Sequence, residues 1–248
     1  GFDRPKICVP LVGRSAEEII AQADQIRQSQ RSSAIDMVEL RGDYLDILPD
    51  YEVLDRLLAK VAEILPEKVL LFTIRSEAEG GEKLAFTTPT IYEINRHVIE
   101  GHLADMVDIE LFSGAEQAEE MIGIAKEKGV KIIMSNHDFQ TTPDASTIVN
   151  RLRSMQDLGA DVVKIAVMPE NKLHVVNLLA ATAMMQEAYA EVPVVTMSMG
   201  KMGAISRISG QVFGSAITFA SFAEASAPGQ IPVDKMDEAL TLIEKYCN

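Results

Sequence analysis

Short apolar runs alternate with longer stretches of helical periodicity along the whole chain. Strands that are buried on both faces, as in a parallel sheet, are typically such continuous apolar runs. The runs predict eight strands: Ile7–Val12, Met37–Arg41, Val69–Arg75, Met106–Leu111, Lys131–Asn136, Val162–Val167, Val194–Met199 and Ile217–Ser221.

The stretches between the runs repeat apolar residues at spacings of three and four, which predicts amphipathic helices. The predicted helices are Ala16–Gln30, Val53–Ile64, Ala115–Lys128, Ala145–Leu158, Lys172–Ala190 and Val233–Tyr246. Ser15 precedes Glu18 by three residues, which is a capping-box pattern at a helix start. Gly129 and Gly159 follow helical stretches, as C-terminal cap glycines do.

Eight strand–helix alternations in 248 residues, without a break in composition, predict one α/β domain, a (β/α)8 TIM barrel over residues 1–248. An open doubly wound sheet is the alternative. Such a sheet usually carries a Gly-rich dinucleotide-binding turn after its first strand, and residues 10–14 (PLVGR) are not one.

Composition narrows the class of protein further. Hydrophobic residues make up 47% of the chain, enough for a sizeable core, and the net charge is −14 without basic runs. An acidic chain of this kind is a poor partner for nucleic acid or an anionic membrane, and no run approaches the roughly 18 apolar residues of a membrane span. The two cysteines, Cys8 and Cys247, and the lack of a secretory signal indicate a reduced, cytoplasmic protein. No CxxC or HExxH motif offers a metal site, and no cofactor is expected.

Lys164 lies inside the apolar strand Val162–Val167, and this placement is the strongest single indication of chemistry. Lysine is almost never fully buried without a partner or a function. Burial disfavours the charged form, and a neutral amine attacks carbonyls to form Schiff bases. The alternative is that Lys164 pairs with a carboxylate or extends to solvent at the strand end.

In a barrel, the active site lies at the C-terminal ends of the strands, here called the mouth. His137 ends the strand before that of Lys164 and is a candidate general acid–base, or else a capping or surface histidine. The mouth also holds Arg41, Arg75 and Arg207, which suggest an anionic or hydroxyl-rich ligand.

For any single arginine, a structural ion pair with Glu39, Asp43 or Glu110 is an equally good interpretation. Asp108 and Glu110 are two residues apart on one strand, so they share a face. We expect both carboxylates to pair mainly with mouth arginines or with Lys164.

Eight motifs at these strand ends together resemble type I 3-dehydroquinate dehydratase in order and spacing, over essentially the whole chain. They are Glu39-x-Arg41-x-Asp43, Thr73-x-Arg75, Glu79-Gly80-Gly81, Ser135-x-His137-Asp138, Lys164-Ile165-Ala166, Met197-x-Met199-Gly200, Ser206-Arg207 and Ser226-Ala227-x-Gly229-Gln230. Each motif is weak alone, and their joint register with the strand ends makes the set specific.

The resemblance implies a hydro-lyase that converts 3-dehydroquinate to 3-dehydroshikimate in the shikimate pathway of aromatic amino acid biosynthesis, without a cofactor and as a homodimer. It implies that Lys164 forms an imine with the substrate ketone, that His137 moves the protons and that Glu79 orients His137. By the same resemblance, further residues contact the ring hydroxyls (Glu39, Arg41 and Arg75) or the substrate carboxylate (Arg207, Ser226 and Gln230). The segment Ser226–Gln230 is similar to a loop that closes over substrate.

Two other functions fit the same residues. A Schiff-base aldolase or transaldolase acting on sugar phosphates would use a barrel lysine, although such sites usually bind phosphate at glycine-rich loops after the seventh and eighth strands. A non-catalytic barrel that binds or regulates is the second alternative, because the barrel fold alone does not decide function.

Overall fold

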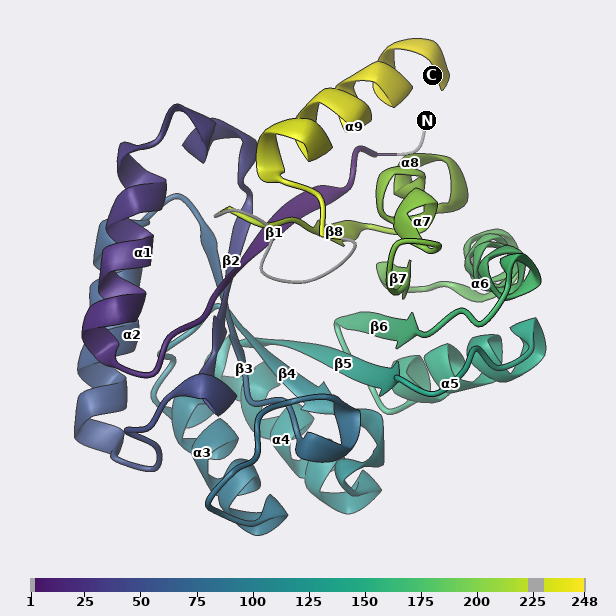
Figure 1. Cartoon of the computed structure of the whole chain (residues 1–248). Coiled ribbons are helices and arrows are strands. Elements are labelled where there is room, and N and C mark those ends of the chain that lie inside the picture. The colour runs from purple at the N-terminus through teal and green to yellow at the C-terminus, as the bar shows by residue number, and fades with distance from the viewer. Residues whose placement is uncertain (1–2, 223–229, 248) are drawn as a thin grey trace.

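The protein is a nearly closed barrel of parallel strands surrounded by helices, seen in a computed structural model that describes residues 3–222 and 230–247 (Figure 1). The strands are β1 (Lys6–Leu11), β2 (Met37–Arg41), β3 (Val69–Thr73), β4 (Met106–Glu110), β5 (Lys131–Asp138), β6 (Val162–Val167), β7 (Val194–Ser198) and β8 (Ile217–Phe219). They pair in the order β7-β6-β5-β4-β3-β2-β1-β8. The predicted single-domain TIM barrel is confirmed.

The barrel closes between β7 and β8 through a few contacts instead of a full ladder. Val194 and Ser215 form an isolated parallel bridge, and the Ala216 N–H donates to the Val194 carbonyl at 2.8 Å. In the ladder at the other side of β8, the register pairs Cys8 of β1 with Phe219. These contacts on the two sides of β8 close the barrel although β8 is short.

Helices cover the outside of the strands (Figure 1). They are α1 (Ala16–Gln28), α2 (Tyr51–Ile64), α3 (Thr88–Glu100), α4 (Ala115–Lys128), α5 (Ala145–Asp157), α6 (Lys172–Met184), α7 (Ala204–Ile208), α8 (Gly210–Phe213) and α9 (Val233–Cys247). The long helix predicted to reach Ala190 ends at Met184, and a π-helical turn continues it over Met185–Tyr189. Among residues 3–222 and 230–247, no helix is long and apolar enough to cross a bilayer.

Helix α3 was not among the predicted helices. It is rich in Thr, Ile and Val, whose β-branched side chains lower helix propensity. Ile94, Val98 and Ile99 are nevertheless fully buried at helical spacing. Packing against the barrel therefore stabilises this helix more than its local preference does.

Two apolar layers make up the core. One lies between the strands and the helices, and the other fills the inside of the barrel. The inner layer includes Met37, Met106, Met197 and Met199, so methionines fill the barrel as core residues. Because side chains alternate along a strand, the residues two positions beyond this layer also point inward. Those positions carry the polar groups of the candidate site.

Candidate active site

Polar side chains form a second layer inside the barrel, above its apolar floor. Each lies two positions after an apolar inward residue on its own strand: Glu39 after Met37, Thr73 after Leu71, Asp108 after Met106, Ser135 after Ile133, and Lys164 after Val162. Thr73, Asp108 and Ser135 are fully or almost fully buried. The fold thus places polar groups from five strands, three of them ionisable, in one enclosed layer.

Lys164 lies at the centre of this layer with only 3% of its surface exposed. Its Nζ is 3.7 Å from Asp108 Oδ2, 4.0 Å from Glu39 Oε1 and 4.5 Å from the centre of the Phe219 ring. The alternative in which Lys164 extends to solvent is therefore wrong. Lys164 does lie within ion-pair distance of two carboxylates, as the other alternative expected. Its amine lies at the base of the mouth.

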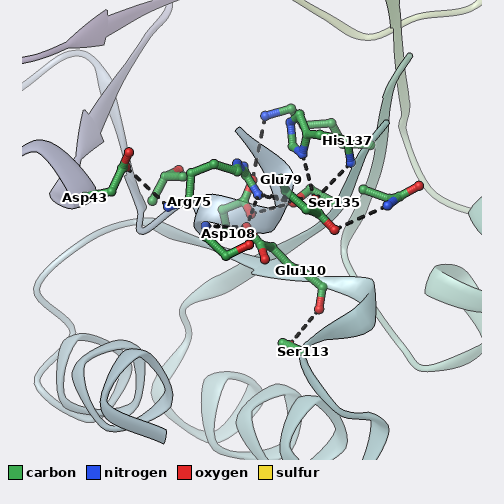
Figure 2. Close-up of polar contacts among 12 residues, drawn as sticks. Asp43, Arg75, Glu79, Asp108, Glu110, Ser113, Ser135 and His137 are labelled. Atoms are coloured by element: carbon green, nitrogen blue, oxygen red, sulfur yellow. Dashed lines mark hydrogen bonds and ion pairs between the residues drawn. The ribbon is translucent and has the colours of Figure 1, made fainter. Parts of the chain in front are cut away.

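Arg75 is held in a buried ion-pair network (Figure 2). Its guanidinium donates to Asp108 Oδ2 at 2.8 Å, to Glu110 Oε1 at 3.0 Å and to Ser135 Oγ at 2.9 Å. Burial opposes the charge of Arg75, but Asp108 and Glu110 raise its pKa above the ordinary value. The expectation that Asp108 and Glu110 pair with a mouth arginine is confirmed.

His137 is oriented by Glu79, which lies in the single 3₁₀ turn Glu77–Glu79 after β3 (Figure 2). The backbone N–H of His137 donates to Glu79 Oε2 at 2.9 Å, and Nδ1 is 3.0 Å from the same oxygen. A proton on Nδ1 satisfies this contact and leaves Nε2 as the acceptor. Nε2 can therefore accept a proton, and the surface-histidine alternative is wrong because only 10% of the side chain is exposed.

Burial disfavours the charged form of both members of this pair. It raises the pKa of Glu79 to about 7, with Glu110 adding to the effect and Arg75 opposing it. Burial also holds the pKa of His137 well below its ordinary value, and the charges of Arg75 and Lys164 act in the same direction. An uncharged imidazole is consequently available near neutral pH.

Two glycines make the Glu79 turn possible. Gly80 has a φ of 83°, in the left-handed region that other residues avoid. A Cβ on Gly81 would lie 2.0 Å from the backbone oxygen of Arg75. The Glu79-Gly80-Gly81 motif thus reflects a backbone constraint that carries Glu79 back to His137.

The other two arginines have different surroundings. Arg41 donates from Nε and NH2 to the two carboxylate oxygens of Asp43, each at 2.8 Å. Arg207 has no carboxylate within ion-pair distance among the residues that the structure describes, and its Nε is buried without a hydrogen-bond partner there. Its NH1 donates to the Phe219 carbonyl at 3.4 Å, and burial lowers its pKa.

Two predicted substrate-binding residues belong to the segment after β8. Ser226 lies outside the described residues. Gln230 is described and half-buried, close before the bridge between Ser221 and Pro232. The structure therefore brings together Glu39, Arg41, Arg75, Glu79, His137 and Lys164 in one layer or its rim, with Arg207 at the β8 side.

Asn136 contributes to the site without having been predicted. Its Nδ2 donates to Glu79 Oε1 at 3.3 Å, and its Oδ1 accepts from Arg151 NH1 at 3.0 Å. Strand alternation places Asn136 on the face opposite to His137, so a search for inward residues passes over it. In the described part of the chain, no group of three or more His, Cys, Asp or Glu side chains is arranged to hold a metal ion.

Comparison with known proteins identifies relatives over the full barrel. Residues 7–247 match the family model described as Type I 3-dehydroquinase. The 3-dehydroquinate dehydratase of Salmonella typhimurium is 44% identical over 245 residues, which cover 99% of this chain and 95% of that protein. The crystal structure of type I 3-dehydroquinate dehydratase from Clostridium difficile has a TM-score of 0.94 at 42% identity, covering 99% and 94% of the two chains. The enzyme from Enterococcus faecalis has a TM-score of 0.88 at 41% identity, covering 96% and 94%.

Proposed function

We propose, from the premise that the chain belongs to the type I 3-dehydroquinase family, that it removes water from 3-dehydroquinate through an imine formed by Lys164. The family makes the protein a hydro-lyase, a 3-dehydroquinate dehydratase. The observation that carries the covalent mechanism is a buried amine two strand positions below an oriented, uncharged imidazole. In the register of β5 and β6, Ser135 pairs with Lys164, so His137 lies two residues nearer the mouth on the neighbouring strand.

In the covalent step, Nζ of Lys164 adds to the ketone carbon of the substrate. The ketone oxygen leaves as water, and a carbon–nitrogen double bond forms. A protonated imine accepts electrons better than a ketone, so the neighbouring carbon loses a proton more easily. The Clostridium difficile relative was solved with covalent modified comenic acid, which supports covalent chemistry within the family.

His137 is assigned the proton transfers. Its Nε2 takes the proton from the carbon next to the imine and then delivers it to the departing hydroxyl, which leaves as water. Hydrolysis of the imine returns the free amine of Lys164 and releases the enone product. Glu79 supports both transfers because its carboxylate keeps the proton on Nδ1, at 3.0 Å.

Arg207 is assigned the substrate carboxylate, together with Ser226 and Gln230. A buried guanidinium without a carboxylate partner is costly, and an anionic ligand would remove that cost. Among the residues that the structure describes, Arg75 and Arg41 differ from Arg207 because carboxylates already pair with them. This contrast among three arginines supports one anion-binding position at the β8 side of the mouth.

Glu39, Arg41 and Arg75 are assigned to the ring hydroxyls. Glu39 Oε1 accepts a hydrogen bond from Thr73 at 2.9 Å, which leaves its second oxygen for a substrate hydroxyl. Arg41 uses two nitrogens on Asp43, which leaves NH1 for the ligand. Arg75 would bind a hydroxyl while it also holds Asp108 and Glu110.

The family assignment replaces the two alternative functions, a sugar-phosphate aldolase and a non-catalytic barrel. Beyond the reaction, we place the enzyme in the shikimate pathway, in the cytoplasm and in a homodimer, with one catalytic domain over residues 1–248. The net charge of −14 supports a protein that binds a small molecule and no nucleic acid. The proposed chemistry uses protein groups only, with neither metal nor organic cofactor.

Borohydride reduction in the presence of 3-dehydroquinate tests the covalent mechanism. Reduction of the imine should leave a stable adduct in the intact mass, and peptide mapping should place it on Lys164. The variant Lys164→Ala should fold, form no adduct and show no turnover. Dehydration without an adduct, or turnover by Lys164→Ala, would reject the imine while keeping the substrate.

A further inference from the structure

A cavity lies behind the polar network, on the outer side of β3 and β4. It has a volume of about 190 Å³ and is lined by the Glu77–Glu79 turn, α3, the 3₁₀ turn Leu111–Ser113 and the start of α4. Figure 2 shows Ser113 and Glu110 at this edge of the network, where Ser113 Oγ donates to the Glu110 carbonyl at 2.7 Å. Lys164, His137 and Arg207 do not line it, so this cavity adjoins the proposed substrate site and shares Glu79 with it.

The lining of the cavity has two chemical characters. Ile91, Ile109, Phe112 and Met121 supply an apolar side. An apolar cavity of about 150 Å³ is large enough to hold a benzene molecule. The volume here therefore fits a ligand with a body of about that size.

The lining of the cavity also offers hydrogen-bond acceptors. Asn95 on α3 has 4% of its surface exposed, and its Oδ1 has no hydrogen-bond partner among the described residues. Leaving a buried polar atom unpaired costs about 1–3 kcal/mol, so a ligand that donates a hydrogen bond is favoured there. Asn95 lies on the cavity wall with Glu79 and Glu110.

The charge around the cavity is negative. Glu79, Asp108 and Glu110 all line it. They share Arg75 at 3.9, 2.8 and 3.0 Å, and Asp108 is also 3.7 Å from Lys164, so three carboxylates face two cations. Burial and the neighbouring Glu110 raise the pKa of Glu79 to about 7, as expected where carboxylates outnumber cations. A positive ligand would relieve this excess of negative charge.

We propose that the cavity binds a small organic cation, an ammonium group on an apolar body about the size of a benzene ring. The ammonium donates to Asn95 Oδ1 and to the carboxylates of Glu79 and Glu110, and the apolar body lies against Ile91 and Phe112. Glu79 also holds His137, so occupancy is coupled to the proton transfers. This coupling rests on the proposed function, whereas the binding itself does not.

Benzylamine is the probe, and benzyl alcohol is its uncharged counterpart of similar shape. In an NMR titration of the ¹⁵N-labelled full chain, benzylamine should shift amides of α3, the Leu111–Ser113 turn and α4. It should bind at least about tenfold more tightly than benzyl alcohol, because hydrogen bonds to charged groups are the stronger ones.

The pH dependence of binding tests the position of the ammonium. Glu79 faces Arg75, Asp108, Glu110 and His137, and its pKa of about 7 separates an uncharged from a charged carboxylate. Benzylamine stays protonated between pH 6 and pH 8, so its affinity should rise over this range as Glu79 ionises. Benzyl alcohol should show no such rise.

Two variants and a matched control complete the test. Asn95→Leu should weaken benzylamine binding about tenfold or more, and Ile91→Trp should fill the cavity and abolish binding. Asn150→Leu makes the same change as Asn95→Leu on the exposed side of α5 and should bind like the parent. If Asn95→Leu does not fold, benzylamine binding to Ile91→Trp tests the proposal.

The proposal is overturned if benzylamine fails to bind, binds no better than benzyl alcohol, or binds both variants unchanged. Shifts confined to amides near Lys164 and His137 would also overturn it, because they would place the ligand in the mouth. Borohydride trapping of 3-dehydroquinate is measured separately without benzylamine. Failure of the trapping therefore rejects the mechanism of dehydration and leaves the binding result standing.

Discussion

Replacing Asp108 by asparagine should destabilise the fold strongly, because it removes the charge from one partner of a buried ion pair. The Asp108 side chain is fully buried, 2.8 Å from Arg75, and it accepts from Ser135 Oγ at 2.6 Å. Asn keeps the shape and removes the charge. Breaking a buried ion pair on one side costs about 3–5 kcal/mol. Because Arg75 keeps Glu110 at 3.0 Å, we expect about 3 kcal/mol.

Chemical denaturation at pH 7 measures this loss as a lower midpoint with an unchanged slope. For a chain of this size, about 3 kcal/mol corresponds to a fall in Tm of roughly 6–12 °C. The control is Asp24→Asn, which breaks a solvent-accessible pair with Arg27 at 2.8 Å on α1. Pairs of this kind contribute about 0–1 kcal/mol, so the control should unfold nearly like the parent.

The free energy of unfolding that Asp108 contributes should depend on pH in a definite direction. Burial alone would raise the pKa of Asp108, but Arg75 and Lys164 lower it below the ordinary value. A depressed folded-state pKa contributes stability above the unfolded value of about 3.9 and loses it as pH falls through the folded value. The difference in free energy of unfolding between the parent and Asp108→Asn should therefore be largest near pH 7 and should decrease below about pH 4. A loss under about 1 kcal/mol at pH 7, with an unchanged slope, would refute this account of the network.

Four further predictions concern catalysis. His137→Ala should still give the borohydride adduct while turnover falls about 10²–10⁴-fold, and loss of the adduct would show that His137 acts before the imine. Since burial and nearby cations lower the pKa of His137, the titration of its imidazole followed by NMR should have a midpoint below pH 6.5; a midpoint above that value would contradict an uncharged base. Glu79→Gln should reduce kcat with little change in adduct formation, which stopped-flow and trapping measure together. Arg207→Ala should raise KM about tenfold or more with a smaller effect on kcat, whereas an unchanged KM would remove Arg207 from carboxylate binding.

Most of the fold could be predicted from local pattern. Continuous apolar runs marked the strands, because a strand covered on both faces has no polar face to show. Helix α3 was not predicted, because its β-branched residues lower its helix propensity. Its packing against the barrel stabilises it instead. The position of Lys164 in an apolar strand was likewise visible in the sequence, since strand alternation alone directs it inward with Val162 and Ala166.

The sequence by itself determined which residues point into the barrel and at which height, because alternation and strand length are local properties. Only the tertiary structure decided which charges meet. Arg75 and Arg207 look alike as mouth arginines, yet Arg75 meets Asp108 and Glu110 from the next strand, whereas no carboxylate among the described residues reaches Arg207. Asn136 supports Glu79 from the outward face of β5. Such pairings depend on barrel closure, which brings residues far apart in the chain within hydrogen-bond distance, and no periodicity encodes that distance.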